Sequence, residues 1–437
     1  MDFEKIKKEW STKGEDYAKQ INEMIDFIEK NGWESWEKLG KKESEDKREY
    51  LAKDVYKLLK QANDENKLEE FRKDFLPSRE PFIKYVEQNG KFIGDMYFIE
   101  NEKIVFMTGT SYQRRKTYVL DGENIEKISE DIRSIGKSHK NNIFAIAYDE
   151  KIEVYKGFFG EKIGEFERKV TKGTLKKYDD GSEDFKFSIT NLIPFNNGKK
   201  VLLLSSYGMY LISENEEKLL HPNFIEDKEN NFFEDDEDFD FYLDMENLCL
   251  SYNNDFIVVG DQDRDFRILN ENGEKIGSIG PQASSYPHFC IFSKDDKFLA
   301  MNSCHFYNGA TCVIEEKNFT EKIGAWDGNS EKYKIIDEEM RVYAGVATEK
   351  YFIFGDAYGY IRAIDEKGNH LWRHYLGSTI SGITISDDEK TLWVGSYSGI
   401  LHKLKLGGGQ DSHTIGNGNH KEERRFIFWN EENILKW

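Results

Sequence analysis

This sequence lacks the segments that direct a chain into or across a membrane. No window approaches the roughly 18 apolar residues that a helix needs to cross a bilayer. The start, MDFEKIKKEW, is charged and has no apolar leader core. The cysteines form no CxxC pair, and each falls in or beside a strand-like run, as buried reduced thiols do; they are Cys249, Cys290, Cys304 and Cys312. These absences predict a cytoplasmic protein without a membrane contact.

Signatures of catalysis are missing as well. The chain has no P-loop, no GxSxG elbow, no HExxH motif and no zinc-like spacing of Cys and His. His370 and His374 share a strand-like segment, where their spacing places them about 13 Å apart, too far for a common metal. Cys304 and His305 are adjacent, so on a strand they point to opposite sides. The sequence therefore predicts no enzyme, no catalytic residue, no metal and no cofactor.

Positive charge is also in deficit. The net charge is −20, and the first 90 residues account for only −3 of it. Bulk negative charge repels phosphate at long range, so a nucleic-acid partner is not expected. Aromatic residues make up 14% of the chain, with 23 Tyr and 31 Phe, and this richness favours β-strands.

Residues 1–80 predict a small helical domain. Apolar residues recur at helical spacing over 21–28, 50–59 and 68–75, and Asn31-Gly32 and Pro77 supply stops. The outward positions are dense in Lys and Glu. Two roles fit such a domain equally, a cap that aids folding of the rest and a module that docks a partner.

From about residue 91 the apolar pattern changes to strand alternation and recurs. Seven units follow one another at spacings of roughly 40–58 residues, which brackets the period of a four-stranded propeller blade. Their apolar strands are KIVFMTG, NIFAIAY, KVLLLSS, DFIVVG, KFLAMNS, YFIFG and TLWVG. The tripeptide KIG recurs at 162–164, 275–277 and 322–324, each time as an expected fourth strand. The pattern predicts a mainly β fold, with a seven-bladed β-propeller over 81–406.

One repeat carries a resemblance to known families. The segment GDAYGYIRAIDEKGNHLW (355–372) resembles a blade of the WD40-like and quinoprotein-like (PQQ-like) β-propellers, with a small-Gly turn, an alternating strand, an acidic-Gly turn and a Trp. The resemblance covers about 91–406 and implies the propeller fold. No blade carries a GH…WD pair, and the regular tryptophan pattern of the quinone enzymes is absent. The resemblance therefore implies little about activity.

The seventh repeat, which ends at Leu406, lacks an obvious fourth strand. Residues 407–437 begin as a Gly/Asn-rich linker and end with the strand-like RRFIFW (424–429). An open ring would leave a sheet edge unpaired. We expect either this tail or PFIKYVE (81–87) to close the ring; in the second case the tail would dock elsewhere.

The turns between second and third strands are the first candidate binding residues. Six of the seven turns contain a tyrosine, and in a propeller these turns lie on one face. Tyrosine offers a rigid amphipathic contact, although it also packs well beside turn glycines, and both interpretations stay open. The candidates are Tyr112, Tyr148, Tyr207, Tyr307, Tyr358 and Tyr397, with Asp356 near Tyr358. The one turn that lacks a tyrosine adds Asp261, Asp263 and Arg264.

An acidic insertion over 224–244 is the second candidate. It holds ten acidic residues and one lysine, interleaved with aromatic rings. It could be a solvated loop, a site for a hard cation without the spacing of a calcium loop, or a segment that docks a basic partner. Its candidate binding residues are Phe232, Phe233, Asp235, Asp236 and Asp238.

These features predict a non-enzymatic interaction scaffold or a regulatory, accessory subunit. Its protein partner would bind the propeller face and the helical domain, because propeller loops vary while the blades stay rigid. One alternative is a receptor for a small molecule or glycan in the central channel. Another is a propeller enzyme of the hydrolase or quinoprotein type.

Overall fold

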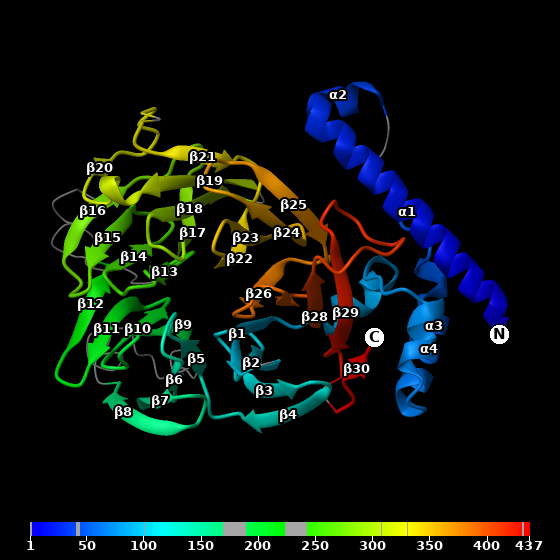
Figure 1. The fold of residues 1–437 in the computed structure, drawn as a ribbon, viewed down its shortest axis with the longest axis horizontal. Coiled ribbons are helices and arrows are strands. Elements are labelled where there is room, and N and C mark those ends of the chain that lie inside the picture. The colour runs from blue at the N-terminus through cyan, green and yellow to red at the C-terminus, as the bar shows by residue number, and fades with distance from the viewer. Residues whose placement is uncertain are drawn as a thin grey trace, which may run out of the picture. The chain divides into compact units, whose positions relative to one another are not determined.

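The computed structural model describes residues 2–40, 44–100, 102–168, 189–222, 243–306, 308–329, 331–430 and 432–437. The fold is mainly β, a seven-bladed β-propeller with a helical N-terminal region, which confirms the predicted fold class (Figure 1). The chain divides into two compact units. The first unit is Met1–Ile93, Tyr358–Arg362 and Leu371–Trp437; the second unit is Gly94–Ala357 and Ala363–His370.

The predicted helical stripes all fall in helices of the first unit, but α1 begins at Phe3, well before the stripe at 21–28. Asp2 caps α1, because its side chain accepts a hydrogen bond from the Lys5 amide, and Gly32, with φ 79°, ends it. Pro81 lies in the first turn of η2, where its missing N–H costs nothing. The helices are α1 (Phe3–Asn31), α2 (Trp33–Lys38), η1 (Glu49–Leu51), α3 (Ala52–Asp64), α4 (Leu68–Asp74), η2 (Glu80–Phe82) and α5 (Ile83–Asn89).

The first three sheets are four-stranded and antiparallel, and each is built from consecutive strands. They succeed one another in chain order (Figure 1). The first contains β1 (Ile93–Glu100), β2 (Lys103–Thr108), β3 (Lys116–Asp121) and β4 (Asn124–Ser129). The second contains β5 (Ser134–Lys137), β6 (Ile143–Ala147), β7 (Lys151–Lys156) and β8 (Glu161–Glu167). The third contains β9 (Ile189–Pro194), β10 (Lys200–Ser205), β11 (Gly208–Ser213) and β12 (Glu217–His221).

The next three sheets continue the pattern, except that the fourth sheet gains a fifth strand, which lies in the sequence among the strands of the fifth sheet. The fourth contains β13 (Asn247–Leu250), β14 (Phe256–Gly260), β15 (Phe266–Asn270), β16 (Lys275–Ile279) and β20 (Lys322–Ile323). The fifth contains β17 (Tyr286–Phe292), β18 (Phe298–His305), β19 (Asn308–Glu315) and β21 (Lys334–Asp337), with η3 (Glu316–Asn318) after β19. The sixth contains β22 (Val342–Ala347), β23 (Phe352–Asp356), β24 (Tyr360–Ile364) and β25 (His370–Tyr375).

The third KIG tripeptide is not the fourth strand of its blade, so that prediction was wrong. Lys322 and Ile323 form β20, which pairs in parallel with β16 of the preceding sheet. The fourth strand of the fifth sheet is β21. The tripeptide is the same, but buried Ile323 packs among the fourth and fifth sheets, and that packing decides where the strand pairs.

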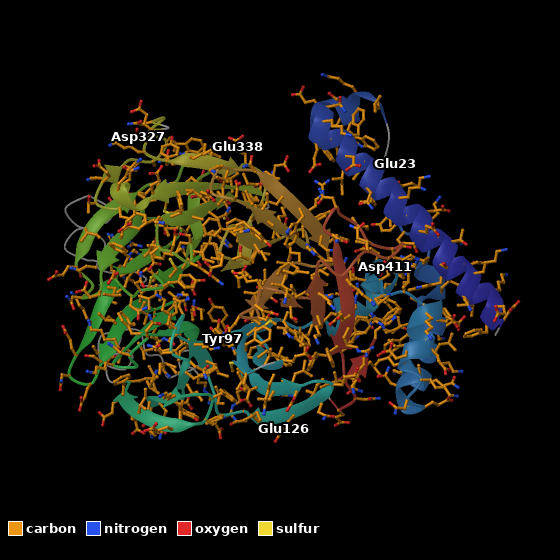
Figure 2. All side chains as sticks on the ribbon, in the orientation of Figure 1. Glu23, Tyr97, Glu126, Asp327, Glu338 and Asp411 are labelled. Atoms are coloured by element: carbon orange, nitrogen blue, oxygen red, sulfur yellow. The ribbon has the colours of Figure 1, made fainter. Side chains whose placement is uncertain are left out.

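The position of each strand in its sheet explains its sequence. Central strands such as β6 and β10 are buried on both faces, so they are continuous apolar runs. The outer strand β4 is mostly exposed and polar. Figure 2 shows Glu126 on this strand, directed away from the sheets, and Tyr97 on the first strand of the same sheet.

The tail supplies the fourth strand of the seventh sheet, which confirms one of the two predicted closures. The sheet contains β26 (Ile380–Ile385), β27 (Thr391–Ser396), β28 (Ile400–Leu406), β29 (His420–Ile427) and β30 (Leu435–Lys436). β29 pairs with β28 from Ile400↔Ile427 to Leu406↔His420. The alternative was wrong, because 81–87 is helical, in η2 and α5.

The helical region and the seventh sheet share one hydrophobic core. Trp10 of α1, Val55 of α3 and Phe71 of α4 are buried with Trp429 and Trp437 from the tail. The ring of Trp437 lies 6.0 Å from that of Trp10, centre to centre. Much of the apolar surface of these helices is therefore covered by the last strands of the chain.

Across the described part of the chain, no helix combines the length and the apolar character that a membrane crossing requires.

Candidate functional site

The candidate tyrosines of the second unit lie in the turns where the sequence placed them. Tyr112, between β2 and β3, is 38% exposed. Tyr148 and Tyr207 follow β6 and β10 and are half-buried. Tyr112 thus presents its side chain to solvent, whereas the side chains of Tyr148 and Tyr207 are partly covered by their blades. Tyr307 lies outside the described residues, as do Phe232, Phe233, Asp235, Asp236 and Asp238 of the acidic insertion.

The two candidate tyrosines of the first unit are both exposed. Tyr358 is 46% exposed, and Tyr397 is 41% exposed. The Tyr397 ring also meets Phe92 edge to face, with 5.3 Å between ring centres. This contact fixes the ring while one side stays open, the geometry that suits a rigid contact residue.

The turn after β14 holds a buried charge network. Arg267 donates to Nδ1 of His221 at 2.9 Å, so the imidazole carries its hydrogen on Nε2 and donates it to Asp261 at 2.7 Å. Arg264 donates to the same carboxylate at 2.7 Å. Burial acts to raise the pKa of Asp261, but His221 and Arg264 outweigh it and lower that pKa. The network ties the end of β12 to this turn.

The acidic candidates therefore differ in what they can contact. Asp261 is 1% exposed and Asp356 is fully buried, so both face the blade interior. Asp263 is exposed, whereas Arg264 is half-buried. Burial raises the pKa of the Asp263 carboxyl, and the nearby Asp261 charge adds to the effect.

The hairpin between β18 and β19 presents an aromatic ring that the sequence analysis did not select. Phe306 is 73% exposed, and its φ is 56°, in the left-handed region. His305 pairs with Asn308, which leaves a two-residue turn that needs a positive φ. A bulky residue is uncommon in this conformation and persists only where its surroundings hold it.

Contacts on both sides of the hairpin hold Phe306 in place. Arg341 donates to the Phe306 carbonyl oxygen at 2.6 Å, and its guanidinium lies 5.0 Å from the centre of the Tyr343 ring. The His305 ring stacks on Tyr286 with 6.0 Å between centres. The exposed ring is thus presented on a fixed backbone. No local sequence pattern singles out Phe306 within the turn CHFYNG, because exposure depends on the backbone conformation.

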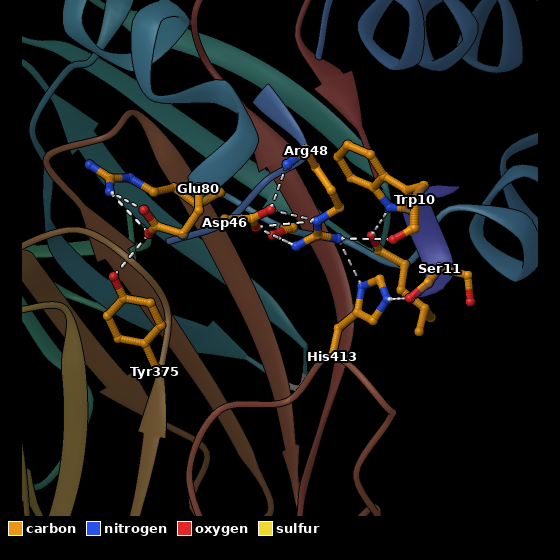
Figure 3. Close-up of polar contacts among 10 residues, drawn as sticks. Trp10, Ser11, Asp46, Arg48, Glu80, Tyr375 and His413 are labelled. Atoms are coloured by element: carbon orange, nitrogen blue, oxygen red, sulfur yellow. Dashed lines mark hydrogen bonds and ion pairs between the residues drawn. The ribbon is translucent and has the colours of Figure 1, made fainter. Parts of the chain in front are cut away.

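A second polar site lies within the first unit, where Arg48 is 1% exposed (Figure 3). Its Nε donates to Asp46 Oδ1 at 2.9 Å, and its Nη2 donates to Oδ2 at 2.6 Å, a two-pronged ion pair. Nη2 also donates to Ser78 Oγ at 2.8 Å. The guanidinium carbon lies 4.6 Å from the centre of the Trp10 ring. These contacts satisfy a charge that would otherwise be costly to bury.

His413 and Glu80 extend this site (Figure 3). Nε2 of His413 lies 3.1 Å from the Ser11 carbonyl oxygen, so Nε2 is the donor and Nδ1 accepts from Arg48 at 3.3 Å. Glu80 accepts hydrogen bonds from Arg79 at 3.1 Å and from the Tyr375 hydroxyl at 2.9 Å. Burial, followed by the Glu80 charge, raises the pKa of Tyr375.

Residues of this site line a small, partly open cavity of about 50 Å³. Glu422 and Arg425 line one part of it, and His374 lines another. Glu422 accepts from Arg425 Nε and from His402 Nδ1, each at 2.6 Å. Burial acts to raise the pKa of Glu422, but the Arg425 charge and the His402 hydrogen bond hold it well below its usual range.

Three polar atoms of the cavity lining are buried without a hydrogen-bond partner. They are Nδ1 of His374, Nη1 of Arg425 and Nε of Arg79. His374 is 4% exposed and Arg425 is 6% exposed, so solvent cannot satisfy them from outside. Unpaired buried polar atoms cost free energy, and these three have almost no accessible surface, so they lie within the wall and do not open onto the cavity.

The buried histidines of the first unit predict a loss of stability in acid. Burial is the first cause that lowers the pKa values of His374, His413 and His420, each to about 4. Unfolding returns them to about 6.5. Between pH 4 and pH 6.5 the unfolded chain binds more protons than the folded chain. The contribution of these histidines to stability is therefore fully present above about pH 6.5 and declines as the pH falls toward 4.

We expect a lower Tm at pH 5 than at pH 7. His374 should account for on the order of 1–3 kcal/mol of the lost free energy of unfolding. The replacement His374→Asn should flatten the decline, whereas His370→Asn, at a residue that is 48% exposed, should not. A flat Tm over this range would contradict the assignment of neutral buried imidazoles.

Neither site contains the ligands of a metal ion. Over the described ranges, no group of three or more His, Cys, Asp or Glu side chains is placed to hold one. The four cysteines are buried free thiols. Burial raises the pKa of Cys304, which keeps this thiol protonated near neutral pH.

Comparisons with known proteins give a structural likeness and no family. No family model matches the chain, and no curated protein matches it. Among solved structures, the chain is similar to one titled "KlHsv2 with loop 6CD replaced by a Gly-Ser linker", at 9% sequence identity and a TM-score of 0.46. That match covers 77% of this chain and 99% of the other. The propeller fold is compatible with a binding role in general.

Proposed function

We propose that the protein is a non-enzymatic interaction scaffold whose propeller binds a basic protein partner through the turns between second and third strands. The hairpin tip at Phe306 carries this proposal. A large ring that is 73% exposed, on a backbone fixed by Arg341, combines apolar area with little entropy to lose on binding. Such rigid aromatic anchors are typical of protein recognition surfaces.

The charge of the chain favours a basic partner. The net charge is −20, and most of it falls after residue 90. Such a field steers a cationic surface toward the propeller and repels a polyanion. Tyr112 and Asp263, in other turns of the same kind, would supply a second ring and a carboxylate. Tyr148 and Tyr207, in turns of the same unit, are proposed as further contacts; Tyr358 and Tyr397 are proposed separately as contact residues of the first unit.

The test compares two exposed phenylalanines that lie in different kinds of turn. Phe306 and Phe159 are both exposed and both have positive φ, but Phe159 lies in the turn between the third and fourth strands of its blade. We expect Phe306→Ala to reduce recovery of a partner in affinity purification at least about tenfold, since hot-spot rings contribute 2 kcal/mol or more. Phe159→Ala should leave recovery unchanged.

Salt dependence gives an independent readout of the same proposal. A partner steered by opposite charge associates more slowly as the ionic strength rises. Equal recovery by the wild type and both variants would exclude the Phe306 hairpin as the contact. An acidic partner, or an association rate that salt does not change, would refute the electrostatic part of the proposal.

A further inference from the structure

The helices of the first unit cover two sheet edges, each through the side-chain amide of one asparagine. β30 is the last strand of the seventh sheet, and residues 411–418 form a strap beside β25, the last strand of the sixth sheet. Asn63 of α3 meets β30, and Asn22 of α1 meets the strap. We propose that the helical region is an edge cap, which keeps these two edges from pairing with a second copy of this chain.

The edge of β30 shows the first cap. Trp437 and Arg425 exchange both of their backbone hydrogen bonds, at 2.8 Å and 2.9 Å. In an antiparallel pair, the neighbouring residue Lys436 then directs its own N–H and C=O away from β29. Asn63 accepts from the Lys436 N–H at 2.9 Å and donates to the Lys436 carbonyl oxygen at 2.9 Å. One side-chain amide thus makes both hydrogen bonds that the facing residue of an added strand would make.

The strap carries the second cap. On its inner side, the Tyr375 N–H of β25 donates to the Ile415 carbonyl oxygen at 2.9 Å. On its outer side, Asn22 donates to the Thr414 carbonyl oxygen at 3.0 Å and accepts from the Gly416 N–H at 2.8 Å. A carbonyl and the N–H two residues further on are the groups that one residue of a parallel strand contacts. Asn22 therefore takes the place of a strand residue as well.

Both caps lie where water cannot easily replace them. Ile415 of the strap is 6% exposed and packs with Ile21 of α1. Leu435 of β30 is 2% exposed and shares a core with Leu59 of α3. Buried backbone groups need a partner, so without the asparagine amides these edges favour opening of the helix or pairing with another strand.

The first five sheets protect their edges in a different way. In each of them the register shifts between the third and the fourth strand. Such a bulge bends the outer strand and makes it a poor template for a further strand. The pairing of β29 with β30 contains no shift. A two-fold contact between copies brings an edge against the same edge, so an uncapped edge supplies its own partner.

The experiment uses the full chain with both amides removed, Asn22→Ala together with Asn63→Ala. Sedimentation velocity from roughly 1 to 100 µM measures the mass in solution. We expect the mass of the double variant to rise with concentration above that of the wild type, because unpaired backbone groups make each edge open more often. In the dilute sample, hydrogen exchange at 411–418 and 434–437 should be at least about tenfold faster than in the wild type, and it should slow again in the concentrated sample.

The matched control is Asn31→Ala together with Asn89→Ala. Both side chains donate to a carbonyl oxygen of their own helix at 2.9 Å, so this variant should match the wild type in mass and in exchange. An Asn22→Ala/Asn63→Ala variant with the mass of the wild type at every concentration would overturn the proposal. Self-association that leaves exchange at 411–418 and 434–437 unchanged would also overturn it. If the double variant fails to fold, each single variant gives the same two readouts at its own edge.

Discussion

Replacing Trp10 with alanine should lower the free energy of unfolding by about 3–5 kcal/mol. Trp10 is fully buried, and its indole N–H donates to the Leu76 carbonyl oxygen at 3.0 Å. Its ring packs against Phe82 and Trp437, at 5.8 Å and 6.0 Å between centres. The substitution removes this contact area and leaves a cavity in the core that the helices share with the tail. Urea unfolding followed by far-UV circular dichroism measures the loss.

Trp33 provides the matched control for this prediction. It lies at the start of α2, is 52% exposed, and donates to Glu37 at 2.8 Å. Its replacement by alanine should change the free energy of unfolding by no more than about 0.5 kcal/mol. Equal effects at Trp10 and Trp33 would contradict a core shared by the helices and the seventh sheet.

The replacement Glu422→Gln should cost about 3–5 kcal/mol of stability, because it removes one partner of a buried ion pair. The carboxylate of Glu422 is bonded to both Arg425 and His402. Glutamine keeps the shape of the side chain but leaves the Arg425 charge buried without compensation. Thermal and urea unfolding of the variant would register the change.

The adjacent residue, Glu423, tests whether burial is the reason for the large effect expected of Glu422→Gln. Glu423 also pairs with a cation, Lys403, at 3.5 Å, but its side chain is 34% exposed. An exposed pair of this kind contributes little, so Glu423→Gln should shift stability by at most about 0.5 kcal/mol. A mild Glu422→Gln variant would mean that water reaches the Arg425 charge.

The blades could be predicted from the sequence because their determinants are local. An apolar run such as Ile143–Ala147 is buried on both faces, and turn residues separate it from the next strand. The segment RRFIFW (424–429) was recognised as one of two candidates for the closing strand, and the structure extends that strand back to His420. In contrast, the run at 81–87 fits both a strand and a helix, and Pro81 in a first helical turn decides the outcome.

The candidate sites were less accessible to sequence reasoning because they depend on tertiary placement. Arg48 and His413 are 365 residues apart, and no motif links them. The turn containing Phe306 was found, but its left-handed φ and its contact with Arg341 exist only in the folded hairpin. Asp261 was selected from its turn, and its burial beneath His221 follows from packing of the blade.

Hydrogen exchange of the chain with and without its recovered partner tests the proposed recognition surface most directly. The account predicts slower exchange in peptides that cover the turns at 109–115, 261–265 and 303–309 when the partner is bound. The turn at 157–160, which holds the control residue Phe159, should exchange at the same rate in both samples. Protection at 157–160 with no change at 303–309 would contradict the proposal that the Phe306 hairpin meets the partner.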